Sequence, residues 1–275
     1  MKRQNRINRI LNIIVILLIL CFLCLLFYST YNIAIWAIDN KKTQTVIEDI
    51  EEVIDVQETN EDVEIINNDE KEDEFNPYWD FINSNLIDVD FKDLKKANSD
   101  VKGWIQVNGT SINFPFVQTN DNEYYLTHSF NKKRNLAGWV FLDYRNDISD
   151  FNNKNTILYA HGRLDKTMFG SLKNILTSGW LNKKSNYVVK LSTEYEDTLW
   201  QVFSVYRIPT TNDYIKTSFV NDEDFENFVN MLLERSAHNF NTSVSGLDRI
   251  LTLSTCYNSD EKVVLHAKLI KRKIK

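Results

Sequence analysis

The feature that most limits the fold of this chain is an uninterrupted apolar segment near its start. Residues 10–28 read ILNIIVILLILCFLCLLFY, nineteen residues with a single Asn and no charge. A helix needs about 20 such residues to cross the hydrocarbon core of a bilayer. Four basic residues precede the segment: Lys2, Arg3, Arg6 and Arg9. None follows before Lys41. The positive-inside rule then places the N-terminus in the cytoplasm and everything after about residue 30 outside the cell.

A cleaved signal peptide is the alternative interpretation of this segment. The apolar region of a signal peptide spans about 7–15 residues and is followed by a cleavage site with small residues. The apolar run here is longer, and no clear site of this kind follows it. The sequence therefore favours an uncleaved single-pass membrane anchor over residues 1–30.

A strongly acidic stretch follows the anchor. Residues 48–74 hold fourteen Asp or Glu against the single Lys71, and no aromatic residue, Gly or Pro. This composition favours a solvated, self-repelling spacer over residues 31–74. The alternative is a short helix over 46–56, because Val46, Ile50, Val53 and Ile54 would share one face. Without this stretch the soluble part is nearly neutral, which argues against nucleic acid as a partner.

Residues 75–275 are long enough for one domain with a substantial core. Most of this region is predicted to be β-structure, with a hairpin turn at Asn108-Gly109. Strands are expected over 101–107, 111–118, 138–144, 156–159, 187–191, 199–208, 249–255 and 263–270. Inserted helices are expected over 90–98, 168–177 and 222–237. Many short strands with a few helices indicate a closed or nearly closed β-barrel.

Cys256 is the only thiol outside the apolar segment, which holds Cys21 and Cys24. An unpaired cysteine in an extracellular domain is either an inert core residue or a nucleophile. Cys256 follows one predicted strand directly, and His161 follows another. Two strand ends on one rim of a barrel can bring a thiol and an imidazole within reach, as a Cys–His nucleophile requires. Each residue taken alone also fits a purely structural role.

Several segments together resemble the sortases, and class B sortases most closely. The segment Thr252-Leu-Ser-Thr-Cys256, followed after a short loop by residues 263–270, is similar to the C-terminal hallmark of that family. The segment Thr156-Ile-Leu-Tyr-Ala-His161-Gly, with Met168-Phe169 after it, looks like the part that bears the family's catalytic histidine. Further segments in the same order are 95–105, 116–118, 122–126, 137–145, 201–206 and 214–217.

The resemblance implies a membrane-anchored cysteine transpeptidase, a hydrolase or acyltransferase, whose catalytic domain (75–275) is an eight-stranded sortase β-barrel outside the cell. Cys256 would attack the carbonyl after the Thr of an Asn-Pro-x-Thr-type sorting signal on a secreted protein and form a thioester. An amine of the peptidoglycan precursor would then release the product. His161 would protonate the leaving amine and take a proton from the incoming one.

The sequence departs from the family pattern at the basic residue that steadies the oxyanion. Sortases place an Arg just before the last strand, whereas this chain has Lys262 after the short loop 257–261. A lysine supplies charge but not the planar fork of a guanidinium. Three interpretations follow. In the first, Lys262 replaces the family's arginine and the reaction is slower; in the second, Arg163 beside the histidine supplies the charge. In the third, the protein is an impaired surface module that binds peptides.

The resemblance also implies a groove for the sorting signal. The residues at matching positions are Asn122, Leu126, Tyr159, Thr210, Tyr214, Ile215 and Ser254. Leu126 and Ile215 fit a plain core role equally well. Ser254, two residues before Cys256 on an extended strand, should face the same side as the thiol.

No metal site and no cofactor are expected. Asp143, Asp147 and Asp150 lie near one another but lack the spacing and the Gly of an EF-hand loop. No Cys/His spacing fits zinc, and a chain with seven glycines has no Gly-rich phosphate loop.

Overall fold

The structure, a computed structural model, describes residues 2–66 and 78–275, which fall into two compact units that meet between Thr45 and Val46. The helices, including three short 3₁₀ helices labelled η, are α1 (Lys2–Val53), α2 (Tyr78–Ile82), α3 (Lys92–Ala97), η1 (Tyr124–Leu126), η2 (Gly170–Leu176), α4 (Ser178–Leu181), η3 (Lys184–Asn186) and α5 (Asp222–Glu234). The strands are β1 (Val56–Thr59), β2 (Glu64–Ile65), β3 (Leu86–Val89), β4 (Val101–Val107), β5 (Asn113–Val117), β6 (Phe141–Leu142), β7 (Asn155–Tyr159), β8 (Val188–Thr193), β9 (Glu196–Pro209), β10 (Ile250–Cys256) and β11 (Glu261–Ile274).

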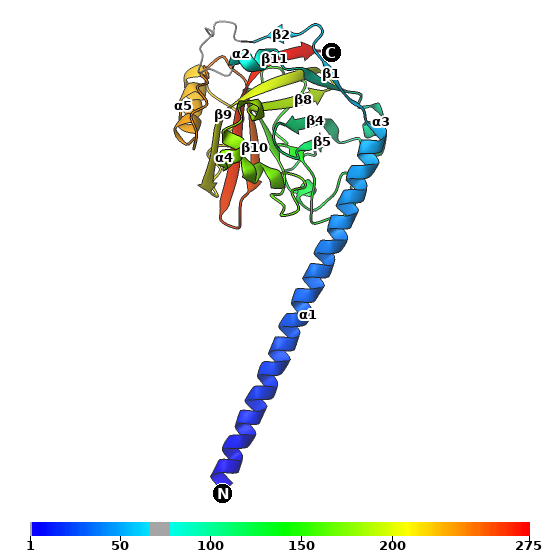
Figure 1. Ribbon diagram of the computed structural model, residues 1–275, viewed down its shortest axis with the longest axis vertical. Coiled ribbons are helices and arrows are strands. Elements are labelled where there is room, and N and C mark those ends of the chain that lie inside the picture. Colours follow the sequence, from blue (N-terminus) through cyan, green and yellow to red (C-terminus); the bar gives the residue numbers. More distant parts are fainter. Residues whose placement is uncertain (1, 67–77) are drawn as a thin grey trace. The chain divides into compact units, whose positions relative to one another are not determined.

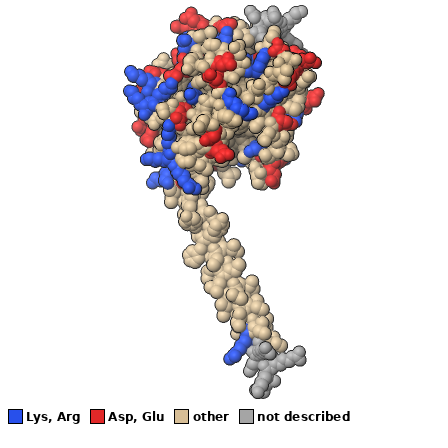
Figure 2. Space-filling view, turned by 180° about the vertical axis from the view of Figure 1, so that it is seen from behind, with Lys and Arg blue, Asp and Glu red and all other residues tan. Residues whose placement is uncertain are grey.

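The first unit is the N-terminal part of α1. By its length and composition, this helix is long and apolar enough to cross a membrane. Figure 2 shows a long stretch of it without charged side chains. The predicted apolar helix is therefore present, and its length and composition are those of a membrane anchor.

The second unit is built on a closed barrel of eight strands. Neighbouring strands follow the order β10-β7-β6-β5-β4-β8-β9-β11, and the pairing of β10 with β11 closes the ring. The two longest strands, β9 and β11, pair antiparallel along most of their length. Figure 1 shows β10 and β11 in orange and red beside β9. The predicted eight-stranded barrel is confirmed.

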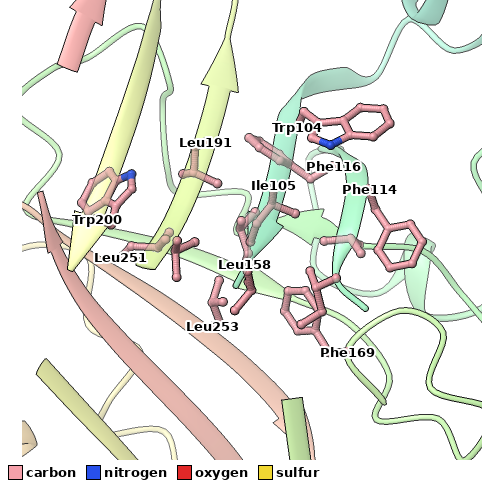
Figure 3. Packing of buried hydrophobic residues seen from close by; sticks show 14 of the residues in the cluster. Trp104, Ile105, Phe114, Phe116, Leu158, Phe169, Leu191, Trp200, Leu251 and Leu253 are labelled. Atoms are coloured by element: carbon pink, nitrogen blue, oxygen red, sulfur yellow. The ribbon is translucent and has the colours of Figure 1, made fainter. Parts of the chain in front are cut away.

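Successive residues of the barrel strands face two separate apolar clusters. Leu251, Leu253 and Leu265 belong to the main core inside the barrel, where Figure 3 shows side chains from several strands packed together. Their neighbours Ile250 and Val264 belong to a second cluster on the outer face of the wall. Because strand residues alternate between faces, β10 is buried on both sides, and Ser254 shares its outer face with Cys256.

Helix α5 covers the second cluster, as its amphipathic sequence predicts. The buried face of α5 consists of Phe225, Phe228, Val229 and Leu232. The side chain of Asn221 caps the first turn by accepting a hydrogen bond from the Asp224 amide. The helix therefore covers the outer face of the barrel wall, where Ile250 at the start of β10 belongs to the same cluster.

The expectation of a solvated spacer over 31–74 is wrong for much of that segment. Helix α1 continues to Val53, and Val46 and Ile50 are buried in the main core. Strand β1 pairs with β3, and β2 pairs with β11 as a ninth strand at the sheet edge. The compact unit thus begins at Val46 rather than at residue 75. Residues 67–74 of the expected spacer lie outside the described residues.

Burial of apolar residues such as Val46 and Ile50 accounts for the order in this segment, and two of its acidic residues also meet basic residues of the barrel. Glu58 pairs with Lys190 at 3.2 Å, and Glu64 pairs with Arg272 at 2.7 Å. Self-repulsion predicts an extended spacer only when such counter-charges are absent. The opposite charges lie far away in the sequence, so the local composition could not reveal them.

Two predicted elements are shorter than expected. The strand predicted over 138–144 is reduced to β6, because Gly138 has φ +63° and a turn follows Asp143. The helix predicted over 168–177 becomes η2 followed by α4. Met168 has φ 52°, which is incompatible with a right-handed helix, so no helix begins there.

Candidate active site

The strands β7 and β10 bring His161 and Cys256 to the same edge of the barrel. The two strands run parallel, and the last pair in their register is Ser254 with Tyr159. Cys256 and His161 each lie two residues beyond that pair. The hydroxyl of Thr255 donates to the Ala160 carbonyl at 2.8 Å and extends the connection between the two chain segments. The two strand tips are therefore neighbours, as the sequence predicts.

Cys256 is half-buried, and a cation lies against its sulfur. In the antiparallel pairing of β10 with β11, Lys262 stands directly opposite Cys256. The Lys262 Nζ donates to the Cys256 Sγ at 3.0 Å. The thiol is thus partly exposed rather than sealed in apolar packing, and a basic side chain lies beside the sulfur.

His161 is held by the backbone of the segment that carries η1. Its Nε2 lies 2.8 Å from the Leu126 carbonyl oxygen. A carbonyl only accepts, so in the neutral ring Nε2 carries the hydrogen and Nδ1 is the nitrogen that gains and loses a proton. Gly138 packs beside the ring, because a Cβ built there would lie 3.0 Å from the His161 Cδ2.

A groove of about 380 Å³ opens beside these side chains. All ten site residues expected from the sequence line it: Asn122, Leu126, Tyr159, His161, Thr210, Tyr214, Ile215, Ser254, Cys256 and Lys262. The sequence analysis did not select five further lining residues, Phe141, Ala160, Thr211, Asn212 and Thr255. The groove is lined by residues from five separate parts of the chain, which the closed barrel brings together.

Arg163, the alternative source of positive charge, does not line this groove. The Arg163 Nη2 donates to the Asp165 carboxylate at 2.8 Å, and the Arg163 Nε donates to the Thr167 hydroxyl at 3.0 Å. These contacts turn its charge toward its own loop. Lys262 is therefore the basic residue that the fold places at the sulfur.

The part of the groove wall formed by Leu126, Tyr214, Ile215 and Ser254 combines apolar packing with a hydrogen bond. Tyr214 and Ser254 are both buried, and their hydroxyl oxygens lie 2.9 Å apart. Leu126 packs against the main core and Ile215 against the second cluster, while both also line the groove. The core and groove roles that the sequence left open for these two residues are combined.

Asp143 is a residue of this site that the sequence analysis missed. Its carboxylate accepts from the Tyr159 hydroxyl at 2.9 Å and from the Asn122 Nδ2 at 3.1 Å. The sequence analysis considered Asp143 only as a calcium ligand. The available signal was an ionisable residue at the end of the apolar run 137–142, where a buried charge requires partners.

Comparisons with known proteins identify the chain. A family model of the sortase domain matches residues 105–270. Sortase B of Listeria monocytogenes is 32% identical over 250 residues, which cover 88% of this chain and 91% of that protein. The chain belongs to the sortase family. As a class B sortase it is a cysteine transpeptidase.

Solved structures of class B sortases agree with this assignment. The X-ray structure of Clostridium perfringens sortase B is 35% identical and has a TM-score of 0.62, covering 66% of this chain and 100% of that one. A Staphylococcus aureus sortase B–substrate complex is 37% identical and has a TM-score of 0.61, covering 66% of this chain and 84% of that one. The fold that carries the candidate site is thus a sortase fold.

Proposed function

We propose that this sortase is membrane-anchored and cleaves an Asn-Pro-x-Thr-type sorting signal on secreted proteins, then transfers each protein to an amine of the peptidoglycan precursor. The presence of Cys256, Lys262 and His161 together in the lining of one groove, with Lys262 in contact with the sulfur, is the observation that carries the proposal. A Staphylococcus aureus sortase B has been solved as a substrate complex, which supports a substrate site on this fold.

In the first step the Cys256 thiol gives its proton to the His161 Nδ1, the sulfur attacks the Thr carbonyl carbon, and a tetrahedral intermediate forms. Lys262, within hydrogen-bond reach of the sulfur, stabilises the oxyanion on the adjacent carbon. The C–N bond then breaks, and the departing amine takes a proton from the His161 Nδ1. The product of this step is a thioester between the signal and Cys256.

In the second step the acceptor amine attacks the thioester carbonyl. His161 takes a proton from this amine at the same nitrogen, the Cys256 sulfur leaves as the new amide forms, and the proton returns from His161 to the sulfur. The Leu126 carbonyl keeps Nε2 protonated throughout, so one nitrogen serves both steps. No metal or cofactor takes part.

Helix α1 would hold the catalytic unit at the outer face of the membrane, with the basic N-terminus in the cytoplasm. The partners would be secreted proteins with a C-terminal sorting signal. Protease added to intact cells should remove the catalytic unit and leave a membrane-protected N-terminal fragment. Protection of the whole chain would contradict this orientation.

The proposal is tested with the full chain in detergent, a fluorogenic Asn-Pro-Gln-Thr-type peptide and a short amine acceptor. We expect cleavage after Thr, a Cys256 adduct with the mass of the N-terminal peptide fragment, and no turnover by Cys256→Ala. Binding without turnover by the wild type would support the alternative, an impaired sortase-like surface module. Free carboxylate product at saturating amine would indicate a hydrolase.

A further inference from the structure

A buried carboxylate behind the groove connects three parts of the groove wall. Asp143 follows β6 and is fully buried. Besides its contacts with Tyr159 and Asn122, it receives two hydrogen bonds from the Arg145 guanidinium, at 2.8 and 2.7 Å, and one from the Arg145 amide at 2.9 Å. Five donors thus meet one carboxylate, which is the condition for keeping such a charge inside a protein.

The third connection runs through Arg145. The Arg145 Nη2 also donates to the Ile215 carbonyl at 3.0 Å. Asn122 follows β5, Tyr159 ends β7, and Ile215 lies between β9 and α5. All three line the groove. Because these segments are far apart in the sequence, the Asp143–Arg145 pair is what ties them to a common point.

Asp143 stays ionised despite its burial. Burial alone raises the pKa of the Asp143 carboxyl, but the hydrogen bonds from Arg145 and Tyr159 and the charge of Arg145 outweigh it, so the pKa is below its usual value. Burial, with the Asp143 charge, raises the pKa of Tyr159. Tyr159 therefore remains a donor to Asp143.

The network also sets the orientation of Asn122. Its Oδ1 accepts from the Tyr144 amide at 3.0 Å, while one Nδ2 hydrogen goes to Asp143. These partners fix which end of the amide is oxygen and which is nitrogen. The second Nδ2 hydrogen is then available to a peptide carbonyl in the groove.

We propose that Asp143 and Arg145 are positioning residues that hold Asn122, Tyr159 and the Ile215 segment in the geometry that binds the sorting peptide. This inference rests on the proposed function, since it assumes a peptide in the groove. Within the described residues, neither Asp143 nor Arg145 forms a hydrogen bond or ion pair with Cys256 or His161. Their loss should therefore weaken peptide binding more than it slows the chemical steps.

The test uses Arg145→Lys, which keeps the charge but loses the fork, and Asp143→Asn, in the full chain. Arg249→Lys is the matched control, because Arg249 forms a similar two-bond pair with Glu196, at 3.1 and 2.6 Å, at the other end of β10. KM and kcat are measured with the cleavable peptide. The peptide Kd is measured in the Cys256→Ala background, and the rate of Cys256 alkylation by iodoacetamide is measured in the active background.

We expect KM and Kd to rise about tenfold or more in both network variants, since misplaced binding groups cost up to about a hundredfold. The kcat should change less than about threefold, and alkylation should match the wild type. The control should keep the KM and Kd of the wild type. If Asp143→Asn does not fold, the half-exposed Arg145 still provides the test.

Unchanged KM and Kd in Arg145→Lys would overturn the inference, as would an equal rise in Arg249→Lys or a parallel fall in kcat and alkylation. A wild type that binds the peptide without turnover contradicts the proposed chemistry alone, and the Kd comparison still decides the role of the network. A wild type that binds no sorting peptide overturns both proposals.

Discussion

Lys262 stands at the position where the family pattern has an arginine, and its ammonium lies 3.0 Å from the Cys256 sulfur. We expect Lys262→Ala to lower kcat/KM on the order of 10²–10³-fold, the usual cost of losing one oxyanion donor. Lys262→Arg should retain or raise activity. The measurement is steady-state cleavage of the sorting peptide. A near-normal rate for Lys262→Ala would indicate that Arg163 supplies the charge at the oxyanion. Inactivity of Lys262→Arg would show that Lys262 does not correspond to the family's arginine.

Gly138 is constrained by both its backbone and its neighbours. It has φ +63°, and an added Cβ would lie 2.5 Å from the Tyr125 carbonyl oxygen and 3.0 Å from the His161 ring. Gly138→Ala should lower the free energy of unfolding by about 1–3 kcal/mol and reduce turnover by displacing His161. The control is Gly179→Ala, since a Cβ at Gly179 meets only the Thr177 hydroxyl, at 4.0 Å. Denaturant unfolding and peptide cleavage check both effects, and equal behaviour of the two variants would contradict them.

At the scale of elements, the end of α1 is part of the folded unit. Ile50 is buried in the core, whereas Val53 is 59% exposed on the same helix. We expect Ile50→Ala to lower the free energy of unfolding of the catalytic unit by about 2–4 kcal/mol, and Val53→Ala to leave it nearly unchanged. Denaturant melts of residues 46–275 measure the difference. Small effects in both variants would support the interpretation of this segment as a solvated spacer.

At the scale of the whole molecule, acid should destabilise the fold through His266. This side chain is fully buried between Thr252 and Tyr206, at 2.9 and 2.8 Å. Burial, together with the charge of Arg235, lowers the pKa of His266 to about 3. Between about pH 3 and about pH 6.5, the unfolded chain, whose histidine pKa is about 6.5, therefore binds more protons than the folded chain. Stability is complete above pH 6.5 and falls as the pH drops toward 3.

The measurement is the free energy of unfolding at pH 4.5 to 7.5, a range above the titration of most carboxyls. The contribution of His266 has a slope of at most about 1.4 kcal/mol per pH unit. The matched variant is His266→Gln, which keeps a polar group without the proton equilibrium and should flatten the profile. The same slope in both proteins would show that other groups cause it.

The parts of the fold that could be predicted from the sequence are those that depend on local residue patterns. The N-terminal apolar run, the apolar strands β10 and β11, the Asn108-Gly109 turn and the amphipathic α5 each follow from residues within one segment. The parallel tips of β7 and β10 could also be anticipated, because Cys256 and His161 each follow an apolar strand. The resemblance to sortases placed the groove residues along the chain, and the structure places all of them in one groove. Their roles remain proposals.

What only the tertiary structure decided are the partners of charged and hydrogen-bonding groups. The contact of Lys262 with the sulfur depends on the register of β10 against β11, and the tautomer of His161 depends on a carbonyl 35 residues away. The acidic segment after α1 meets cations that the local composition does not show, and Asp143 accepts hydrogen bonds from Asn122 and Tyr159, which lie in other segments. The physical reason is that periodicity is a property of neighbouring residues, whereas the energy of a charge depends on groups that meet only when the barrel closes.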